Sequence, residues 1–216
     1  MLKLDEAEKL LIQTFEGYIF AHQTYYGVCA IGDFAEEINK TSFANTFGTL
    51  QGELGDLAYV RICALYETST RNKTTSIPHL VRALKDAETI EGERSGVFLN
   101  AYGRQDITAD EDLPWKRLER FVSSEMQSST FRDAFSIVRT VRDKRIAHSE
   151  AQKTEAAVKY EQMDHLFEIA RRSIQLAGAI YYNENIRPDG ELIPGADLKR
   201  NGLKRLIKRV ISADPI

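Results

Sequence analysis

Apolar residues recur at helical spacing along almost the whole of this chain, and this spacing restricts it to an all-helical fold. An amphipathic helix repeats its apolar residues three and four positions apart, whereas a half-buried strand alternates them. Extended alternation is nearly absent from the 216 residues, and only five prolines interrupt the helical patterns. We therefore expect an all-α protein built as an antiparallel helical bundle.

Capping residues and breakers divide the chain into a series of expected helices. The first helical region runs from about Asp5 to Asn39, interrupted or bent near Gly27 and Gly32. The later helices are expected from a cap at Thr41 or Ser42 to Glu67, from a cap at Ser76 to Asp86, from Pro114 to Met126, from near Ser129 to Ala147, from about Glu155 to Tyr182 and from Leu198 to Val210. The expected stripe of the second helix comprises Leu50, Leu54, Leu57, Ala58, Arg61 and Leu65. We predict a helical domain over residues 1–186, then a linker and a basic amphipathic helix over residues 187–216.

Composition and charge exclude several classes of protein. Hydrophobic residues make up 43% and charged residues 28%, which is ordinary for a soluble protein. The formal net charge of −3 gives no overall attraction to nucleic acid, so any RNA contact needs a local basic patch. The N-terminus lacks a signal-peptide pattern and no apolar run is long enough to span a bilayer, so we expect a cytoplasmic protein without membrane contact. The four histidines are scattered, and we expect neither a metal nor a cofactor.

Arg142 falls within the apolar stripe of the helix expected from Ser129. At about 100° per residue, the stripe that leads to it consists of Phe131, Ala134, Phe135, Val138 and Val141. A guanidinium on a core-facing stripe is costly unless something pairs with it. Two explanations stay open, an arginine that binds an anionic ligand and a buried ion pair with an acid of a neighbouring helix, such as Glu53, Asp56 or Glu67.

His148 follows Arg142 at a distance of six residues and carries the side chain best suited to move protons near neutral pH. On an ideal helix the two side chains lie roughly 120° apart. They converge only if the helix ends or distorts near Ala147, or if a second copy of the chain completes the site. The alternative for His148 is a helix-end histidine whose charge favours the negative C-terminus. An arginine for phosphate and a histidine for a 2′-hydroxyl are two parts of a metal-free ribonuclease.

The string from Arg142 to Glu150, Arg-Asp-Lys-Arg-Ile-Ala-His-Ser-Glu, resembles the signature of the HEPN superfamily (higher eukaryotes and prokaryotes nucleotide-binding domain). That signature is an arginine, a polar residue, a few further positions and a histidine. Arg142, Asp143 and His148 match these positions.

Two further stretches resemble the AbiU-like abortive-infection branch of that superfamily. They are Ala64-Leu65-Tyr66-Glu67 at a helix end and Ser76-Ile77-Pro78-His79-Leu80 at the start of the next helix. The resemblance covers the region from about Thr41 to Tyr182 and implies a helical bundle that forms a homodimer. In such a dimer two Arg–His motifs face each other in a cleft.

The resemblance also implies chemistry for the motif, namely RNA cleavage without metal that leaves a 2′,3′-cyclic phosphate. In this chemistry His148 moves the proton of the 2′-hydroxyl or of the leaving oxygen, Arg142 holds the phosphate, and Asp143 orients either side chain. An antitoxin protein stays open as a partner. Some related toxins carry a tyrosine that a nucleotidyltransferase antitoxin modifies, and this chain has Glu150 at that position, which argues against that type of partner.

Basic residues beside the motif form a candidate RNA-binding patch of Arg139, Lys144 and Arg145. The alternative for this patch is a solvated helix face, because acidic neighbours dilute its charge. The C-terminal basic helix is expected first to pack its apolar side on the bundle and second to contact RNA. The leading hypothesis is therefore a ribonuclease of phage-defence or toxin–antitoxin type. Its rivals are a module that binds RNA or nucleotide without cutting it, and a structural interaction protein that keeps Arg142 in a salt bridge.

Overall fold

The computed structural model describes residues 2–69, 75–86, 114–144, 158–182 and 196–213, and these residues form the expected all-α fold without a β-strand. Its helices are α1 (Leu2–Gly32), α2 (Ala35–Ile38), α3 (Ala44–Leu65), α4 (Ile77–Asp86), α6 (Pro114–Gln127), α7 (Ser129–Arg142), α8 (Tyr160–Tyr182) and α9 (Ala196–Ala213). The ends of α4, α6 and α9 agree with the sequence-based boundaries to within three residues. Helix α8 begins at Tyr160, later than the expected start near Glu155.

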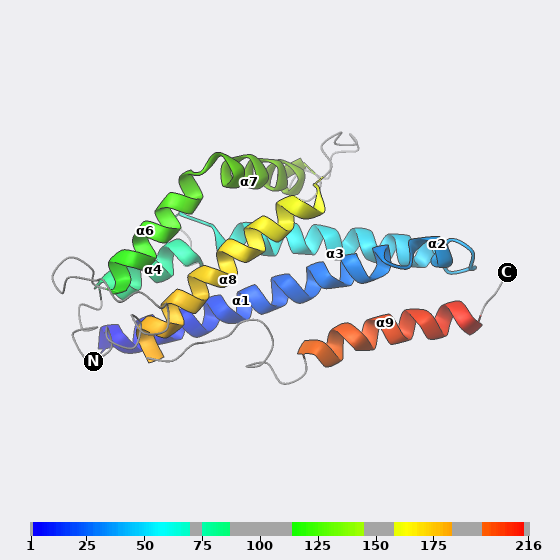
Figure 1. Ribbon diagram of the computed structural model, residues 1–216, viewed down its shortest axis with the longest axis horizontal. Helices are drawn as coiled ribbons and strands as arrows, with labels where there is room; N and C mark the ends of the chain where they lie inside the picture. The colour runs from blue at the N-terminus through cyan, green and yellow to red at the C-terminus, as the bar shows by residue number, and fades with distance from the viewer. Residues whose placement is uncertain (1, 70–74, 87–113, 145–157, 183–195, 214–216) are drawn as a thin grey trace, which may run out of the picture.

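Helices α1 and α3 are the two long members of the bundle and lie side by side along its length (Figure 1). Helix α8 crosses α1, and α4 and α6 pack near the N-terminal end of α1. Helix α7 rests on α3 and α8, while α9 lies along the other end of α1. Helix α7, which ends at Arg142, therefore packs on two different long helices.

The main hydrophobic core fills the space between α1, α3, α4, α6, α7 and α8. Its largest fully buried side chains include Tyr18, Ile62, Leu84, Leu118 and Leu166. Each comes from a different helix, so burial of their apolar surface holds the layers together at about 25 cal/mol per Å².

Helix α1 runs without a break through Gly27, so the expected interruption there is wrong. A Cβ atom on Gly27 would stand 2.9 Å from a methyl group of Leu54, which shows that this glycine allows α1 and α3 to approach closely. Gly32 does end α1, as its position predicts. The cap predicted at Thr41 or Ser42 is also wrong, because Phe43 precedes α3 without a capping side chain. The Thr41 hydroxyl instead donates to the carbonyl oxygen of Ile38.

Only part of the stripe predicted for α3 faces the core. Ala58 and Leu65 are buried, whereas Leu50 and Leu57 are each 41% exposed. The buried face also includes Ile62, which the predicted stripe omitted. Helix α3 therefore has apolar residues on two faces, and the bundle covers one of them.

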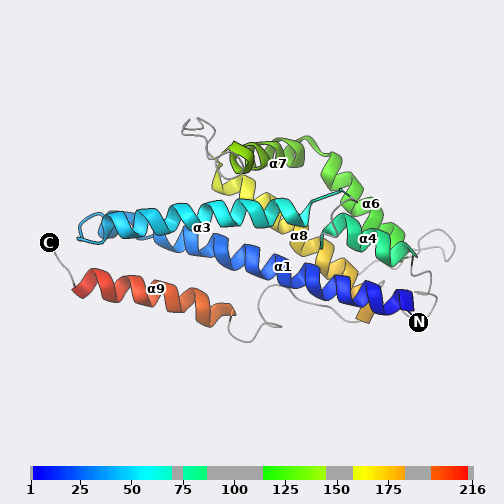
Figure 2. The same ribbon diagram turned by 180° about the vertical axis from the view of Figure 1, so that it is seen from behind.

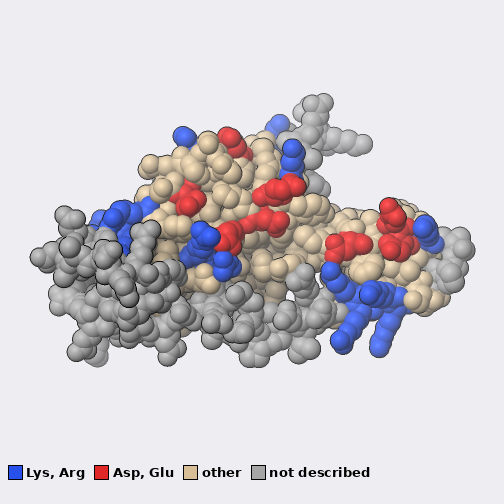
Figure 3. All heavy atoms as spheres, viewed as in Figure 1, with Lys and Arg blue, Asp and Glu red and all other residues tan. Residues whose placement is uncertain are grey.

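Helix α9 packs on the bundle, in the role expected first for it. Its Ile207 is completely buried in a second hydrophobic cluster with Ile31, Ile38 and Phe47. Lys204 Nζ lies 2.6 Å from Asp33 Oδ2, which ties α9 to the end of α1. Figure 3 shows Lys and Arg side chains projecting from α9 beside acidic side chains at this end of the bundle.

Candidate functional site

Helix α7 carries the arginine of the motif and is fixed at its start by a side-chain cap. The hydroxyl oxygen of Ser128 accepts a hydrogen bond of 3.1 Å from the backbone N–H of Phe131, one residue before the expected cap position. Such caps stabilise a helix by about 1 kcal/mol. The apolar face predicted for α7 is buried except for Phe135, which is partly buried, and Val138 and Val141 lead to Arg142. The position of Arg142 is thus set by packing of the whole helix.

Arg142 is half-buried and paired with the residue that follows it. Its Nε and Nη2 atoms donate hydrogen bonds of 2.8 and 2.5 Å to Oδ1 of Asp143. The side chains of Arg142 and Asp143 are 26% and 41% exposed, so water still reaches the pair. Arg139 Nε lies 3.8 Å from the other oxygen of Asp143. The structure therefore brings two predicted site residues, Arg139 and Arg142, to the carboxylate of a third, Asp143.

Cys63 of α3 is a neighbour of this pair that the sequence did not reveal. Burial raises the pKa of the Cys63 thiol to about 11, although the positive charge of Arg142 acts to lower it. For Arg142 itself, burial is the largest single influence and acts to lower the pKa, but the hydrogen bond to Asp143 and the nearby acidic groups together outweigh it and raise the pKa above its ordinary value. The thiol is therefore neutral near pH 7, and the guanidinium stays charged.

Beyond Arg142 the backbone widens into a π-helical turn at Asp143 and Lys144. Such turns interrupt the regular angular spacing of a helix and occur often at functional sites. The side chain of Lys144 is exposed, as the candidate RNA-binding patch requires. Arg145 and His148 lie outside the described residues, so their predicted roles stay predictions.

The remote acids proposed as partners of Arg142 do not provide the ion pair seen here, which Asp143 makes from the same helix. Glu67 acts on Arg142 only through its charge, as one of the smaller influences on its pKa. Arg61, the other arginine predicted in an apolar stripe, lies with its guanidinium carbon 5.3 Å from the ring centre of Phe20. Its Nε atom is buried without a hydrogen-bond partner.

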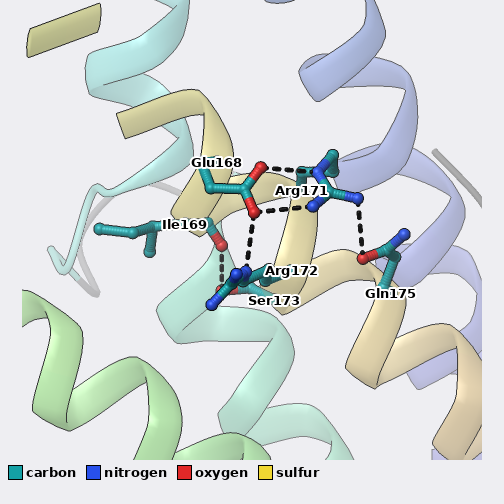
Figure 4. A network of polar contacts seen from close by, with 6 residues as sticks. All are labelled: Glu168, Ile169, Arg171, Arg172, Ser173 and Gln175. Carbon is teal, nitrogen blue, oxygen red and sulfur yellow. Dashed lines mark hydrogen bonds and ion pairs between the residues drawn. The ribbon is translucent and has the colours of Figure 1, made fainter. Parts of the chain in front are cut away.

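Helix α8 carries a second half-buried arginine–carboxylate pair, shown in Figure 4. Arg171 donates from Nε and Nη2 to the two oxygens of Glu168 at 2.8 and 2.7 Å, and Arg172 donates to the same carboxylate. The hydrogen bond from Arg171 is the largest of the effects that lower the pKa of Glu168. This pair resembles the Arg142 pair in exposure but lies on a different helix, where Arg171 also donates to Gln175.

Comparison with protein-family models matches residues 4–200 to the HEPN family described as AbiU2. The chain belongs to the AbiU2 family of HEPN proteins. It is thus an abortive-infection HEPN module with the helical fold that the resemblance implied. Neither the curated proteins nor the solved structures contain a match to this chain.

In this AbiU2 chain, the motif residue Tyr66 performs a packing role. Its buried hydroxyl donates to the backbone oxygen of Leu166 on α8, and its ring meets the edge of Phe131 on α7 at 4.9 Å between centres. Tyr66 therefore joins α3, α7 and α8 beneath the motif helix. Ser76 closes the following loop, because its hydroxyl donates a 2.7 Å hydrogen bond to the carbonyl oxygen of Glu67.

The described part of this AbiU2 chain has neither a candidate metal site nor a membrane-spanning helix. No group of three or more His, Cys, Asp or Glu side chains there could hold a metal ion. No described helix is long and apolar enough to cross a membrane.

Proposed function

We propose that this AbiU2 protein is a metal-independent endoribonuclease of phage-defence or toxin–antitoxin type that acts in the cytoplasm as a homodimer. The observation that carries the proposal is the half-buried guanidinium of Arg142, held in place at the end of α7 by Asp143. Two of its nitrogens donate to Asp143, and no described residue accepts a hydrogen bond from its third, Nη1. A phosphate oxygen is a suitable acceptor there, since arginine recognises phosphate through several parallel donors.

Asp143 is a positioning residue in this proposal. It fixes the plane of the guanidinium, so less side-chain freedom is lost when phosphate binds. Arg139, Lys144 and Arg145 contribute positive charge along the RNA backbone, whose phosphates supply most of the affinity of such contacts.

Cleavage then proceeds by attack of the ribose 2′-oxygen on the adjacent phosphorus. The new bond closes a 2′,3′-cyclic phosphate, and the bond to the 5′-oxygen breaks, leaving a 5′-hydroxyl. One base must take the 2′-proton and one acid must protonate the leaving oxygen. His148 of each copy in a homodimer supplies one of these groups, while Arg142 stabilises the charge that develops on the phosphoryl oxygens.

The test is cleavage of labelled RNA in the presence of a chelator, comparing the wild type with His148→Ala. We expect the wild type to produce cyclic-phosphate ends and His148→Ala to lose cleavage with an unchanged melting temperature. His79→Ala, which removes a partly exposed histidine of α4, is the matched control and should cleave normally.

Activity that disappears with the chelator and returns with magnesium would contradict the mechanism. A His148→Ala protein that cuts as fast as the wild type would contradict the residue assignment. RNA binding without cleavage by the wild type would favour the binding module, in which Arg142 and its basic neighbours hold RNA but no proton is transferred.

A further inference from the structure

The outer surface of α3 carries apolar side chains that the rest of the described protein leaves exposed. Leu50, Leu57 and Val60 are 41%, 41% and 37% exposed, and Ala64 and Glu53 are exposed on the same side. In the view from behind, no other described helix passes in front of α3 (Figure 2). We call these five residues the outer seam.

The residues of the outer seam follow one another at alternating intervals of three and four positions, from Leu50 to Ala64. This interval is the heptad spacing with which one helix packs along another. Ala58 and Ile62, on the opposite face of α3, are already buried in the core. The seam is therefore a second packing face of α3.

Charged residues interrupt the outer seam at one position and border it at another. Glu53 lies within the seam, and no described residue forms an ion pair with it. Arg61 lies at its edge, where its guanidinium stacks on Phe20, which is 52% exposed. The Nε atom of Arg61 is buried within its own chain, and no described residue forms an ion pair with the guanidinium. An occupant that places a carboxylate beside the guanidinium of Arg61 and a cation beside Glu53 would therefore match both unpaired charges.

A second copy of the chain meets both requirements. Glu53 and Arg61 stand four residues on either side of Leu57. If two α3 helices cross antiparallel with Leu57 on the two-fold axis, Glu53 of each copy lies beside Arg61 of the other. A two-fold interface presents the same patch from both copies, so each such contact is made twice. We propose that two copies of this protein associate through the outer seam in this arrangement.

The inference rests on the homodimer of the proposed function and gives that dimer an interface. In an antiparallel pair of helices the two-fold axis is perpendicular to both helices and lies about 90° around each helix from the interface. Cys63, which is near Arg142, lies about 100° around α3 from the middle of the seam, so it is close to the direction of this axis. The two-fold rotation therefore leaves Cys63 and Arg142 of both copies on one face of the dimer. The two Cys63 positions are offset along α3 by roughly 18 Å, at 1.5 Å per residue. Both motifs thus open on the same side.

The first test is sedimentation of the full chain at micromolar to hundred-micromolar concentrations, which needs no RNA. We expect the wild type to be a dimer and Leu57→Glu to raise its dissociation constant by at least roughly 30-fold, as expected for a central apolar contact. Leu206→Glu changes a leucine on α9 that is 55% exposed, and it should leave the dimer unchanged. A monomeric wild type, or a dimer indifferent to Leu57→Glu, would overturn the proposal.

A charge exchange tests the antiparallel register. Glu53→Arg and Arg61→Glu should each weaken the dimer by about tenfold, and the double variant should recover most of that loss because the pairs re-form with opposite sign. If the double variant dimerises more weakly than either single variant, the antiparallel register is wrong.

A cysteine cross-link tests the position of Leu57. Under mild oxidation Leu57→Cys should form a disulfide-linked dimer and Leu206→Cys should not. These experiments measure association alone. A protein that dimerises through the outer seam but does not cleave RNA would therefore contradict the proposed ribonuclease function and support the proposed interface.

Discussion

Replacement of Arg142 by alanine should abolish RNA cleavage while lowering stability only slightly. The expected loss of activity follows from removal of the guanidinium that holds the phosphate. The expected effect on the free energy of unfolding depends on the surroundings of the carboxylate that loses its partner. If the arginine were sealed against a buried acid, its removal would strand a charge at a cost of roughly 3–5 kcal/mol.

The geometry of the pair argues for a much smaller cost. The side chain of Asp143 is 41% exposed, so water solvates its carboxylate when Arg142 is removed. Partly exposed ion pairs contribute up to about 1 kcal/mol, and the lost contacts of the arginine stem add a little more. We therefore expect Arg142→Ala to reduce the free energy of unfolding by about 1 kcal/mol. For a chain of this size that corresponds to about 2–4 °C in melting temperature.

Helix α8 offers a matched control for this experiment. Arg171 is 27% exposed and its partner Glu168 is 42% exposed, values close to those of Arg142 and Asp143. Arg171→Ala should therefore cost about the same stability. It should leave RNA cleavage at the wild-type rate, because Arg171 lies outside the motif, on α8, and donates to Glu168 and Gln175 of that same helix. Thermal melting by circular dichroism and a cleavage assay in chelator measure the two effects on each variant.

A fall of about 9 °C or more for Arg142→Ala, roughly 3 kcal/mol, would refute the reasoning and indicate a structural ion pair. Equal loss of cleavage in Arg142→Ala and Arg171→Ala would show that activity follows stability alone.

Two further predictions concern titratable side chains. The pKa of Glu168 is lowered in the fold, so its contribution to stability is present above the ordinary carboxyl pKa and is lost as the pH falls through the folded value. Melting curves of wild type and Glu168→Gln should accordingly differ near pH 7 and converge in acid, and a constant difference would contradict the assignment. Burial and a pKa of about 11 should keep the thiol of Cys63 unreactive in the folded protein. In a Cys29→Ser background, a thiol reagent at pH 8 should label it only on unfolding, and rapid labelling of the native chain would show that the site opens.

The sequence predicted the helical class and the placement of most helices because the 3.6-residue repeat is a local property. It also placed Arg142 correctly at the end of a buried stripe. The ion-pair alternative named acids of other helices, whereas the guanidinium turns to Asp143 of its own helix, a choice that side-chain torsions decide. The electrostatic influence between Arg142 and Cys63 joins residues far apart in the chain, and no local pattern encodes it.

The stripe predicted for α3 was only partly right for a related reason. Leu50 and Leu57 share the helical period of Ala58 and Leu65, and periodicity alone does not show which of two apolar faces the bundle covers. The missing cap at Thr41 has a local cause, because its hydroxyl donates to the turn that ends α2 and its oxygen accepts from the N–H of Phe43, which precedes α3. The Arg142–His148 geometry stays a prediction, since His148 lies outside the described residues.

The separate hydrophobic cluster beneath α9 has a consequence for how the protein opens. Ile207 anchors α9 in a small cluster distinct from the main core. Elements held by few apolar contacts exchange their amide hydrogens through local opening, at a lower free energy than global unfolding. The amides of α9 should thus exchange as a group before those of α1 and α3. The bundle that carries the motif would then persist while α9 detaches and re-docks, making this helix the first cooperative unit to unfold.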